Sequence, residues 1–362
     1  MDNPKISVLI PMYNRKQYAL QCVDSALNQT FKEDYEIIIR DDCSTDGVYE
    51  FIQEKYAKQI SVGKIKLIRN KNNVGERGNV NKLIRDATGK YFSFLHNDDA
   101  YLPQALQHLY EVAEKFNADV VHGSGCLIFP QDGSNNFVPE IYDSATSKQV
   151  AVMSDIPLVR FQMWLRGEIF WDTQYNLFNR NFMIENEIFN GQASGDPVFL
   201  SLWWTMLSKV FVKTPVIFYV RRKRPKVSLT GKEISHKLEE IISEEIEMSR
   251  EFNRLFNKVE LLKNNEEYQY MAKAFTFFVR EGAKIMHQDI YSNGVTPEIY
   301  NAVKNTFKKY FGDDYSYPMF LFNYAHVMPF SRSSYIINYN ANPPTPPPSR
   351  VGVAACLINI AA

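Results

Sequence analysis

Short apolar runs alternate with helical patterns through the first 130 residues, and this alternation constrains the fold more than any other feature of the sequence. Five such runs lie at residues 6–10, 37–39, 65–68, 91–95 and 120–121. They are almost continuously apolar, which is typical of strands buried on both faces of a parallel sheet. The sequence therefore predicts an α/β fold, with a doubly wound, mostly parallel sheet covered by helices.

The first helix should follow the first strand directly. Asn14 and Gln17 are three residues apart and resemble a capping box, in which two side chains satisfy the free backbone amides at a helix start. Apolar residues then recur at helical spacing over residues 19–27. We therefore expect a capped helix in this segment.

The character of the chain changes beyond this region. Residues 130–150 are polar and contain Gly and Pro, which indicates a loop or an insertion, whereas residues 215–220 resemble a strand. Helical spacing returns after residue 231, so we predict a first domain over residues 1–230 and a mainly helical region over residues 231–340. Residues 341–362 are a proline-rich spacer and a short apolar tail.

Charge and cysteine usage exclude several classes of protein. The chain has 41 Lys and Arg residues against 41 Asp and Glu residues, which argues against a nucleic-acid binder with a broadly basic surface. The four cysteines lie far apart and form no CxxC pair, which argues against a disulfide framework or a zinc site. No apolar run reaches the roughly 18 residues that span a bilayer, and the first residues lack the features of a signal peptide. We expect a cytoplasmic protein.

Polar side chains follow each of the first four predicted strands. In a doubly wound sheet, ligands bind beyond the carboxyl ends of the strands. The residues at these ends are Pro11 and Tyr13, then Asp41 and Asp42, then Arg77 and Asn81, and finally His96, Asn97, Asp98 and Asp99. No GxGxxG motif follows the first strand and no GxxxxGK[ST] motif occurs, so dinucleotide-binding and P-loop interpretations lose their main support.

The adjacent carboxylates of Asp98 and Asp99 are the most informative of these groups. Two carboxylates at a strand end repel each other unless a cation or hydrogen-bond donors offset their charge. Mg²⁺ and Mn²⁺ prefer hard oxygen ligands, and the phosphate oxygens of a ligand would complete their coordination. The alternative is a helix N-cap, because Pro103 lies where prolines are common near helix starts.

Two further clusters each allow several roles. Asp42 could accept a hydrogen bond from a nucleobase imide, but the segment that follows it is also rich in residues that cap helices. The dense basic cluster contains Arg221, Arg222, Lys223, Arg224 and Lys226. It fits a solvated charge run, a patch for nucleic acid or anionic lipid, or a segment that binds phosphate oxygens.

The segments ISVLIPMYNR, IIIRDDCSTDG, NVGERGN and FLHNDDA occur in this order and spacing. The ordered set resembles the family 2 inverting glycosyltransferases of the GT-A fold, which use nucleotide sugars, over about residues 5–225. The resemblance implies that Pro11, Tyr13 and Asp42 hold the nucleobase. It implies that Arg77 contacts the base or the diphosphate, that Asp98 contacts the ribose, and that Asp99 binds Mn²⁺ or Mg²⁺.

The sequence departs from the family pattern at two positions. His96 stands at the first position of a motif that is often Asp-x-Asp-Asp, and Cys43 stands where Gly is usual. The metal-facing Asp99 is retained, so the metal site is still expected. We interpret His96 as a hydrogen-bonded histidine of the core or rim rather than a direct participant.

The resemblance also suggests a catalytic base. The family places a carboxylate before an aromatic helix, and Asp196, followed by Pro197, Trp203 and Trp204, fits that pattern. The alternative role of Asp196 is a helix N-cap, with Pro197 at the first helical position. The family also has a flexible basic segment that closes over the donor diphosphate, which implies this role for Arg222 and Arg224.

These implications combine into one functional expectation. It is the inverting transfer of a sugar, from a nucleoside-diphosphate sugar that is most simply UDP-linked, to a hydroxyl of a glycan or a lipid-linked acceptor. The alternatives are another nucleotide-dependent transferase on the same fold and a non-catalytic protein that binds a nucleotide or a glycan. The helical region has three open roles: shaping the acceptor site, forming a homodimer, or resting on the inner face of the membrane.

Overall fold

The computed structural model describes residues 4–130, 137–141, 149–165, 168–169, 172–189, 197–223, 254–255, 257–259 and 297–312. The chain divides into two units, Met1–Lys223 and Arg224–Ala362. In the second unit the structure describes helix α12 (Pro297–Phe311), within the region predicted to be helical. Most of that region, and all of residues 341–362, lie outside the described residues, so the predicted boundaries there stay predictions.

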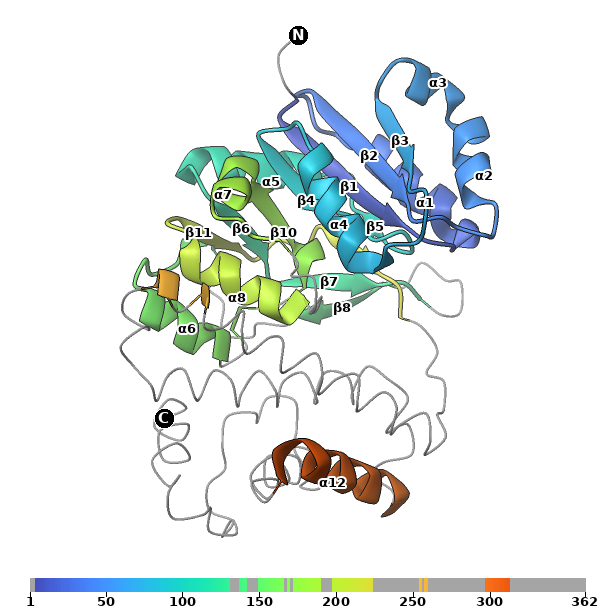
Figure 1. Cartoon of the computed structure of the whole chain (residues 1–362). Coiled ribbons are helices and arrows are strands. Elements are labelled where there is room, and N and C mark those ends of the chain that lie inside the picture. The colour runs from blue at the N-terminus through green and yellow to red at the C-terminus, as the bar shows by residue number, and fades with distance from the viewer. Residues whose placement is uncertain are drawn as a thin grey trace. The chain divides into compact units, whose positions relative to one another are not determined.

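The first unit contains an eight-stranded sheet with the order β3-β2-β1-β4-β10-β6-β11-β9 (Figure 1). Its strands are β1 (Ile6–Met12), β2 (Tyr35–Asp41), β3 (Ile65–Arg69), β4 (Tyr91–Phe94), β6 (Val120–Gly123), β9 (Ala151–Val152), β10 (Asn176–Asn179) and β11 (Phe211–Thr214). All five apolar runs that predicted strands fall in this sheet, and only Leu95 lies outside its strand. The α/β prediction is therefore confirmed.

The order of the strands creates a topological switch point beside β1. Strands β2 and β3 lie on one side of β1 and strand β4 lies on the other, and β1 is parallel to both β2 and β4. Crossovers that leave a central strand in opposite directions open a crevice at the carboxyl ends of the strands. The carboxyl ends of β1 and β4 are therefore where this topology is expected to bind a ligand.

A second sheet, with the order β5-β12-β7-β8, is built from short strands, of which the sequence indicated only the one near residues 215–220. They are β5 (Ala100–Tyr101), β7 (Gly125–Ile128), β8 (Val138–Ile141) and β12 (Tyr219–Arg221). The interpretation of residues 130–150 as a loop was wrong in part, because β8 pairs with β7 there. The strand expected over residues 215–220 begins only at Tyr219. Strands of two or three residues, such as β5 and β12, are too short for a periodic pattern.

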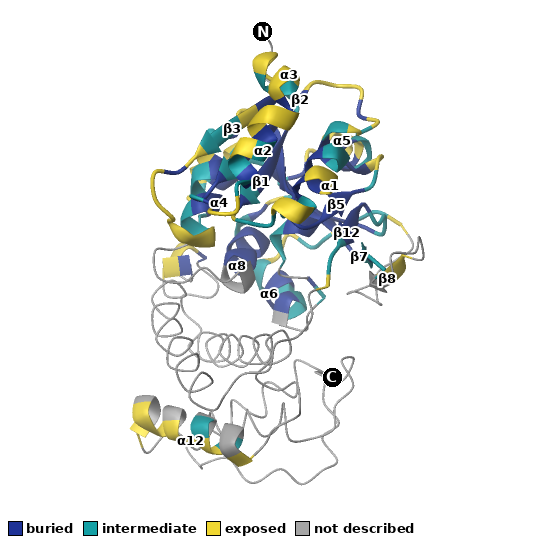
Figure 2. Cartoon of the chain, turned by 90° about the vertical axis from the view of Figure 1, so that its right-hand side faces the viewer, coloured by how far each residue is buried: buried dark blue, intermediate teal, exposed yellow. Residues whose placement is uncertain are grey.

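Helices cover the large sheet. They are α1 (Lys16–Leu27), α2 (Val48–Lys55), α3 (Ala57–Ser61), α4 (Gly75–Asp86), α5 (Ala105–Phe116), α6 (Pro157–Leu165), α7 (Arg180–Glu185) and α8 (Pro197–Leu207), with a 3₁₀ turn, η1 (Thr173–Tyr175). Helix α4 packs on β1 and β2, α5 packs on β6, β10 and β11, and α6 packs on α8. The central strands are buried on both faces (Figure 2), and each buried Val, Leu or Ile side chain contributes about 1.5–3 kcal/mol.

The capping box predicted for α1 was wrong. Asn14 and Arg15 both adopt left-handed backbone conformations, with φ of 55° and 71°, and no side chain of the N-cap residue caps the helix. The amide of Lys16 donates instead to Asp46 Oδ2 at 2.8 Å, and Asp46 Oδ1 accepts from the amide of Val48 at 3.1 Å. Asp46 therefore caps both α1 and α2, a contact across 30 residues that no local pattern reveals.

Gly89 marks a close approach of two backbone segments. A Cβ atom at this position would lie 2.7 Å from the amide nitrogen of Ser7 and 2.8 Å from the carbonyl carbon of Ile6. These are backbone atoms of β1, which cannot move without disturbing the sheet. We expect Gly89→Ala to lower the free energy of unfolding by about 1–3 kcal/mol, measured by urea denaturation. A change within about 0.5 kcal/mol would show that the two segments separate easily.

Candidate functional site

Backbone and side-chain contacts tie together the ends of three neighbouring strands at the switch point. The amide of Asp42, after β2, donates to the carbonyl of Met12 at the end of β1 at 2.8 Å. The side chain of Asn97, after β4, donates to the carbonyls of Tyr13 and Asn14, each at 3.4 Å. The predicted strand-end residues of β1, β2 and β4 therefore lie at one edge of the sheet.

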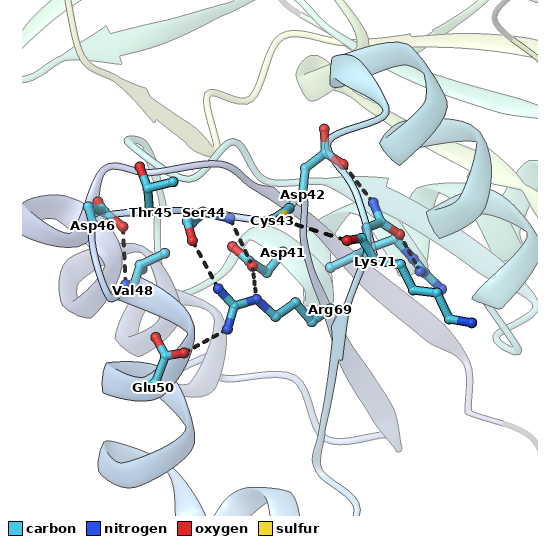
Figure 3. A network of polar contacts seen from close by, with 12 residues as sticks. Asp41, Asp42, Cys43, Ser44, Thr45, Asp46, Val48, Glu50, Arg69 and Lys71 are labelled. Carbon is cyan, nitrogen blue, oxygen red and sulfur yellow. Dashed lines mark hydrogen bonds and ion pairs between the residues drawn. The ribbon is translucent and has the colours of Figure 1, made fainter.

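Hydrogen bonds to one of its two carboxylate oxygens hold the side chain of Asp42 in place. Its side chain is buried, and Oδ1 accepts from Asn70 Nδ2 at 2.8 Å and from the amide of Val74 at 2.9 Å. Within the part of the chain that the structure describes, Oδ2 has no hydrogen-bond partner, and it points away from the surrounding network (Figure 3). The arrangement leaves a single acceptor atom for a ligand.

Asn70 fixes that arrangement. Its Oδ1 accepts from Arg40 Nη1 at 2.9 Å and from Lys82 Nζ at 3.1 Å, so the amide group must turn its two N–H donors the other way. These donors reach Asp42 Oδ1 and Asn79 Oδ1. Asn70 was not among the predicted site residues, although it is the first residue after β3, where the rule that ligand-binding residues follow strands points.

The contacts of the neighbouring Asp41 stabilise the loop that follows β2. It is fully buried, and its Oδ2 lies 3.3 Å from Arg69 Nε and accepts from the amide of Ser44 at 3.1 Å (Figure 3). Arg69 also donates to Glu50 at 2.6 Å and to the carbonyl of Ser44 at 2.9 Å. The alternative expected for this segment, helix capping, applies to Asp46, whereas Asp41 anchors the loop and Asp42 faces the crevice.

Cys43 occupies a position that favours glycine. Its φ is 62°, in the left-handed region, where a side chain costs roughly 1–2 kcal/mol. A residue without a Cβ atom would avoid this cost. With Cys43 in place of the usual glycine, the turn still forms, but its backbone is strained.

Asp99 is almost fully buried, and hydrogen-bond donors reach both of its oxygens. Oδ2 accepts from the Tyr219 hydroxyl at 2.8 Å, and Oδ1 accepts from the amide of Arg222 at 2.7 Å. Burial raises the pKa of Asp99; the charge of His96 opposes this rise, and the charge of Asp98 adds to it. The N-cap alternative is wrong, because β5 follows Asp99 directly and helix α5 begins only at Ala105.

Asp98 and Asp99 fit a cation that is shared with a ligand. In the described part of the chain, no group of three or more His, Cys, Asp or Glu side chains could hold a metal by itself. Each oxygen of Asp99 accepts one hydrogen bond, from Tyr219 or from the amide of Arg222, and keeps lone-pair capacity. Mg²⁺ is commonly bound by one or two carboxylates together with substrate phosphates. The donor set therefore suits a cation completed by a diphosphate.

Arg222 is docked against this acidic corner. Its Nε donates to the Asp98 carbonyl at 3.1 Å and its Nη2 donates to Gln21 at 2.6 Å. The guanidinium carbon lies 4.4 Å from the centroid of the Tyr18 ring and 4.2 Å from that of Phe129. The residue thus brings a positive charge to the crevice from the end of β12.

The remaining predicted site residues have more scattered positions. Pro11 lies within β1, Tyr13 follows that strand with 48% of its surface exposed, and Arg77 lies on α4. Asp196 and Arg224 lie outside the described residues, although helix α8 begins at Pro197, directly after Asp196. The described contacts therefore place Asp42 against the end of β1, and Arg222 against Asp98 and Asp99, which follow β4.

His96 and Tyr219 complete the acidic corner. The amide of His96 donates to the Tyr219 hydroxyl at 3.1 Å, and its carbonyl accepts from the amide of Asp99. These contacts involve the backbone of His96, so the expected role of its side chain as a hydrogen-bonded histidine stays a prediction. Tyr219 was missed by the sequence analysis, because a tyrosine in a short strand carries no signal that distinguishes it from other core residues.

Comparison with known proteins gives a consistent result. Residues 7–174 match the model of glycosyl transferase family 2. The chain is 30% identical over 202 residues to the GalNAc(5)-diNAcBac-PP-undecaprenol beta-1,3-glucosyltransferase of Campylobacter jejuni, covering 55% of this chain and 59% of that protein. It is 37% identical over 120 residues to the poly(ribitol-phosphate) beta-glucosyltransferase of Bacillus spizizenii, covering 33% and 19%. The chain thus spans less than two thirds of either relative.

Solved structures support the fold. S. aureus TarS 1–349 superposes with a TM-score of 0.58 at 14% identity, covering 94% of this chain and 98% of that chain. Its complex with UDP-GlcNAc gives a TM-score of 0.52 at 15% identity with the same coverage. Separately, none of the helices in the described residues is both long enough and apolar enough to cross a membrane.

Proposed function

The chain carries a glycosyl transferase family 2 domain over residues 7–174, and from this premise we propose that the protein is an inverting glycosyltransferase. It moves a sugar from a UDP-linked donor to a hydroxyl of a glycan or a lipid-linked acceptor. The observation that supports the proposal is that Asp42 follows β2, and the Asp98–Asp99 pair follows β4, on the two strands that flank β1. A base-reading carboxylate and an acidic pair at one crevice suit the two ends of a nucleoside diphosphate.

The single free oxygen of Asp42 supports a donor base that has one ring N–H. Uracil carries one ring N–H, at N3, and this group matches one carboxylate acceptor. The other oxygen of Asp42 is already taken by Asn70 and Val74. The UDP-GlcNAc complex of S. aureus TarS gives supporting evidence that this fold accommodates a uridine nucleotide. Tyr13, half exposed beside Asp42, offers a ring against which a base can stack.

The reaction is a single displacement at the anomeric carbon. The acceptor oxygen forms a bond to that carbon while the bond from the carbon to the diphosphate oxygen breaks, and the configuration inverts. The acceptor hydroxyl gives its proton to the carboxylate of Asp196, and UDP leaves with the bonding electron pair. Arg222 lies on the acidic corner, where its charge favours the developing negative charge of the diphosphate.

Asp98 and Asp99 would hold a divalent cation together with the diphosphate. When bound, such a cation supplies electrostatic stabilisation of the leaving group. The chain's own contribution is to fix Asp99 through Tyr219 and the amide of Arg222 before the ligand arrives.

Product analysis tests the proposal. Purified protein is incubated with a panel of nucleoside-diphosphate sugars, Mn²⁺ and glycan or lipid-linked acceptors, and the released nucleotide is identified by chromatography. We expect UDP and a glycosylated acceptor with inverted anomeric configuration. Release of pyrophosphate would instead identify a nucleotidyl transfer, and the absence of any product or nucleotide binding would contradict the proposal.

Asp42→Asn tests the assignment of the base. Oδ1 of the new side chain must still accept from Asn70 and Val74, so its Nδ2 donor should replace the free acceptor Oδ2. Uracil N3–H would then meet another donor, whereas cytosine N3 is an acceptor. We expect UDP affinity to fall by about 10- to 100-fold, equivalent to one lost or unsatisfied hydrogen bond, and CDP affinity to rise relative to UDP, measured by calorimetry.

The variant Asp34→Asn provides a matched control, because Asp34 precedes β2 at the opposite end of the strand. Its nucleotide affinities should equal those of the wild type. Equal losses of UDP and CDP affinity in Asp42→Asn would contradict base reading through this carboxylate.

A further inference from the structure

Tyr219 joins the site to the second sheet through its hydroxyl group. The ring is fully buried, and the hydroxyl accepts from the amide of His96 at 3.1 Å and donates to Asp99 Oδ2 at 2.8 Å. An amide N–H can only donate, so it occupies the acceptor side of the hydroxyl. The one hydroxyl proton is therefore directed at Asp99.

The position of the Tyr219 ring is itself fixed. It meets the ring of Tyr101 at a centroid distance of 5.7 Å and an angle of 77°, and the ring of Tyr175 at 5.4 Å and 88°. Strand β12 pairs with β5 so that Tyr219 lies opposite Tyr101, and Asp99 immediately precedes β5. The register of one short strand pair thus sets the distance between Tyr219 and Asp99.

From these contacts we infer that Tyr219 is the positioning residue for Asp99, the carboxylate that holds the cation and the donor diphosphate. This inference rests on the proposed function. With the amide of Arg222 on Oδ1 and Tyr219 on Oδ2, the carboxylate plane is held from both sides. Residues that orient a metal ligand through hydrogen bonds typically change metal affinity 10- to 100-fold when they are removed.

The same contacts link cation binding to the basic segment. Tyr219 and Arg222 belong to one short stretch of chain at β12, and both donate to Asp99. If the Tyr219 hydroxyl is removed, Asp99 is no longer held on that side, and the part of the nucleotide affinity that depends on the cation should fall. Contacts to the base, which involve Asp42 on the far side of β1, should be unchanged.

The test compares Tyr219→Phe with Tyr101→Phe in the full chain. The Tyr101 hydroxyl is also buried and hydrogen-bonded, to Ser93 and to the carbonyl of Phe94, but among the described residues it makes no hydrogen bond to Asp99. UDP is titrated calorimetrically into each protein with Mn²⁺ and, separately, with EDTA. We expect the gain in UDP affinity from Mn²⁺ to fall by about tenfold in Tyr219→Phe and to persist in Tyr101→Phe, with EDTA affinities unchanged.

Two further measurements complete the design. In an Asp99→Asn background, Tyr219→Phe should produce no additional loss of the Mn²⁺ gain, because the two residues act as one unit. If thermal unfolding shows that Tyr219→Phe does not fold, 3-fluorotyrosine is placed at 219 or at 101. The Mn²⁺ gain should then change only for position 219.

The outcomes separate the two proposals. If the wild type binds UDP with a Mn²⁺ gain and Tyr219→Phe matches Tyr101→Phe, or if fluorination alters the gain at neither position, the role of Tyr219 is overturned while the proposed function stands. If the wild type binds no UDP with or without Mn²⁺, the proposed function is overturned and the inference with it.

Discussion

Asp196→Asn should lower the rate of sugar transfer by about 10²- to 10⁴-fold while leaving UDP affinity and its Mn²⁺ dependence near wild type. The amide has almost the same size as the carboxylate, but it cannot accept the proton of the acceptor hydroxyl at neutral pH. Turnover is measured as UDP release at saturating donor and acceptor, so that the loss appears in kcat. The nucleotide contacts assigned to Asp42 and Asp99 are not altered by this change.

Helix capping is the rival role of Asp196, and substitutions can separate the two roles. Asn and Ser cap helices about as well as Asp, so Asp196→Asn and Asp196→Ser should both retain the stability of helix α8, which begins at Pro197. Neither variant offers a carboxylate base. Wild-type turnover in either variant would remove Asp196 from catalysis, and a loss of turnover that follows a loss of stability would favour the capping role alone.

The central strands and the strand-end residues could be predicted because their signals are local. A run such as residues 37–39 is continuously apolar because β2 is covered on both faces, and the polar residues that follow each strand meet at one edge by topology. The family pattern then added roles for Asp42 and Asp99. The position of Asp42, Asp98 and Asp99 at the carboxyl ends of strands thus depended only on identifying the strands, whereas the strand order comes from the structure.

The parts that sequence reasoning missed depend on contacts between distant residues. Tyr219 reaches Asp99 across 120 residues, and Asp46 caps α1 across 30 residues. Strand β5 contains two residues, which is too few for a hydrophobic period. In each case the partner is selected by the fold as a whole, so that inspection of either segment alone gives no indication of the pair.

Arg160→Met should lower the free energy of unfolding by about 3–5 kcal/mol, because it leaves several buried carbonyl acceptors without donors at about 1–3 kcal/mol each. Arg160 on α6 is fully buried, and its guanidinium donates to the backbone carbonyls of Ser154, Thr205, Ser208 and Lys209. The last three carbonyls lie at or beyond the end of α8, where the helix dipole is negative and carbonyls lack helical partners. A methionine fills most of the space and leaves these acceptors buried without donors.

Lys66→Met is the matched control for this change. Lys66 lies on β3 with an exposed side chain, so the same loss of a positive charge should alter stability by less than about 0.5 kcal/mol. Urea denaturation of both variants measures the difference. Arg160 holds the carboxyl end of the helix that follows Asp196. The rate of sugar transfer in Arg160→Met should therefore also fall, even without urea and at temperatures where the protein stays folded. Equal stability of the two variants would mean that the carbonyls at the end of α8 find water or other donors once the guanidinium is gone.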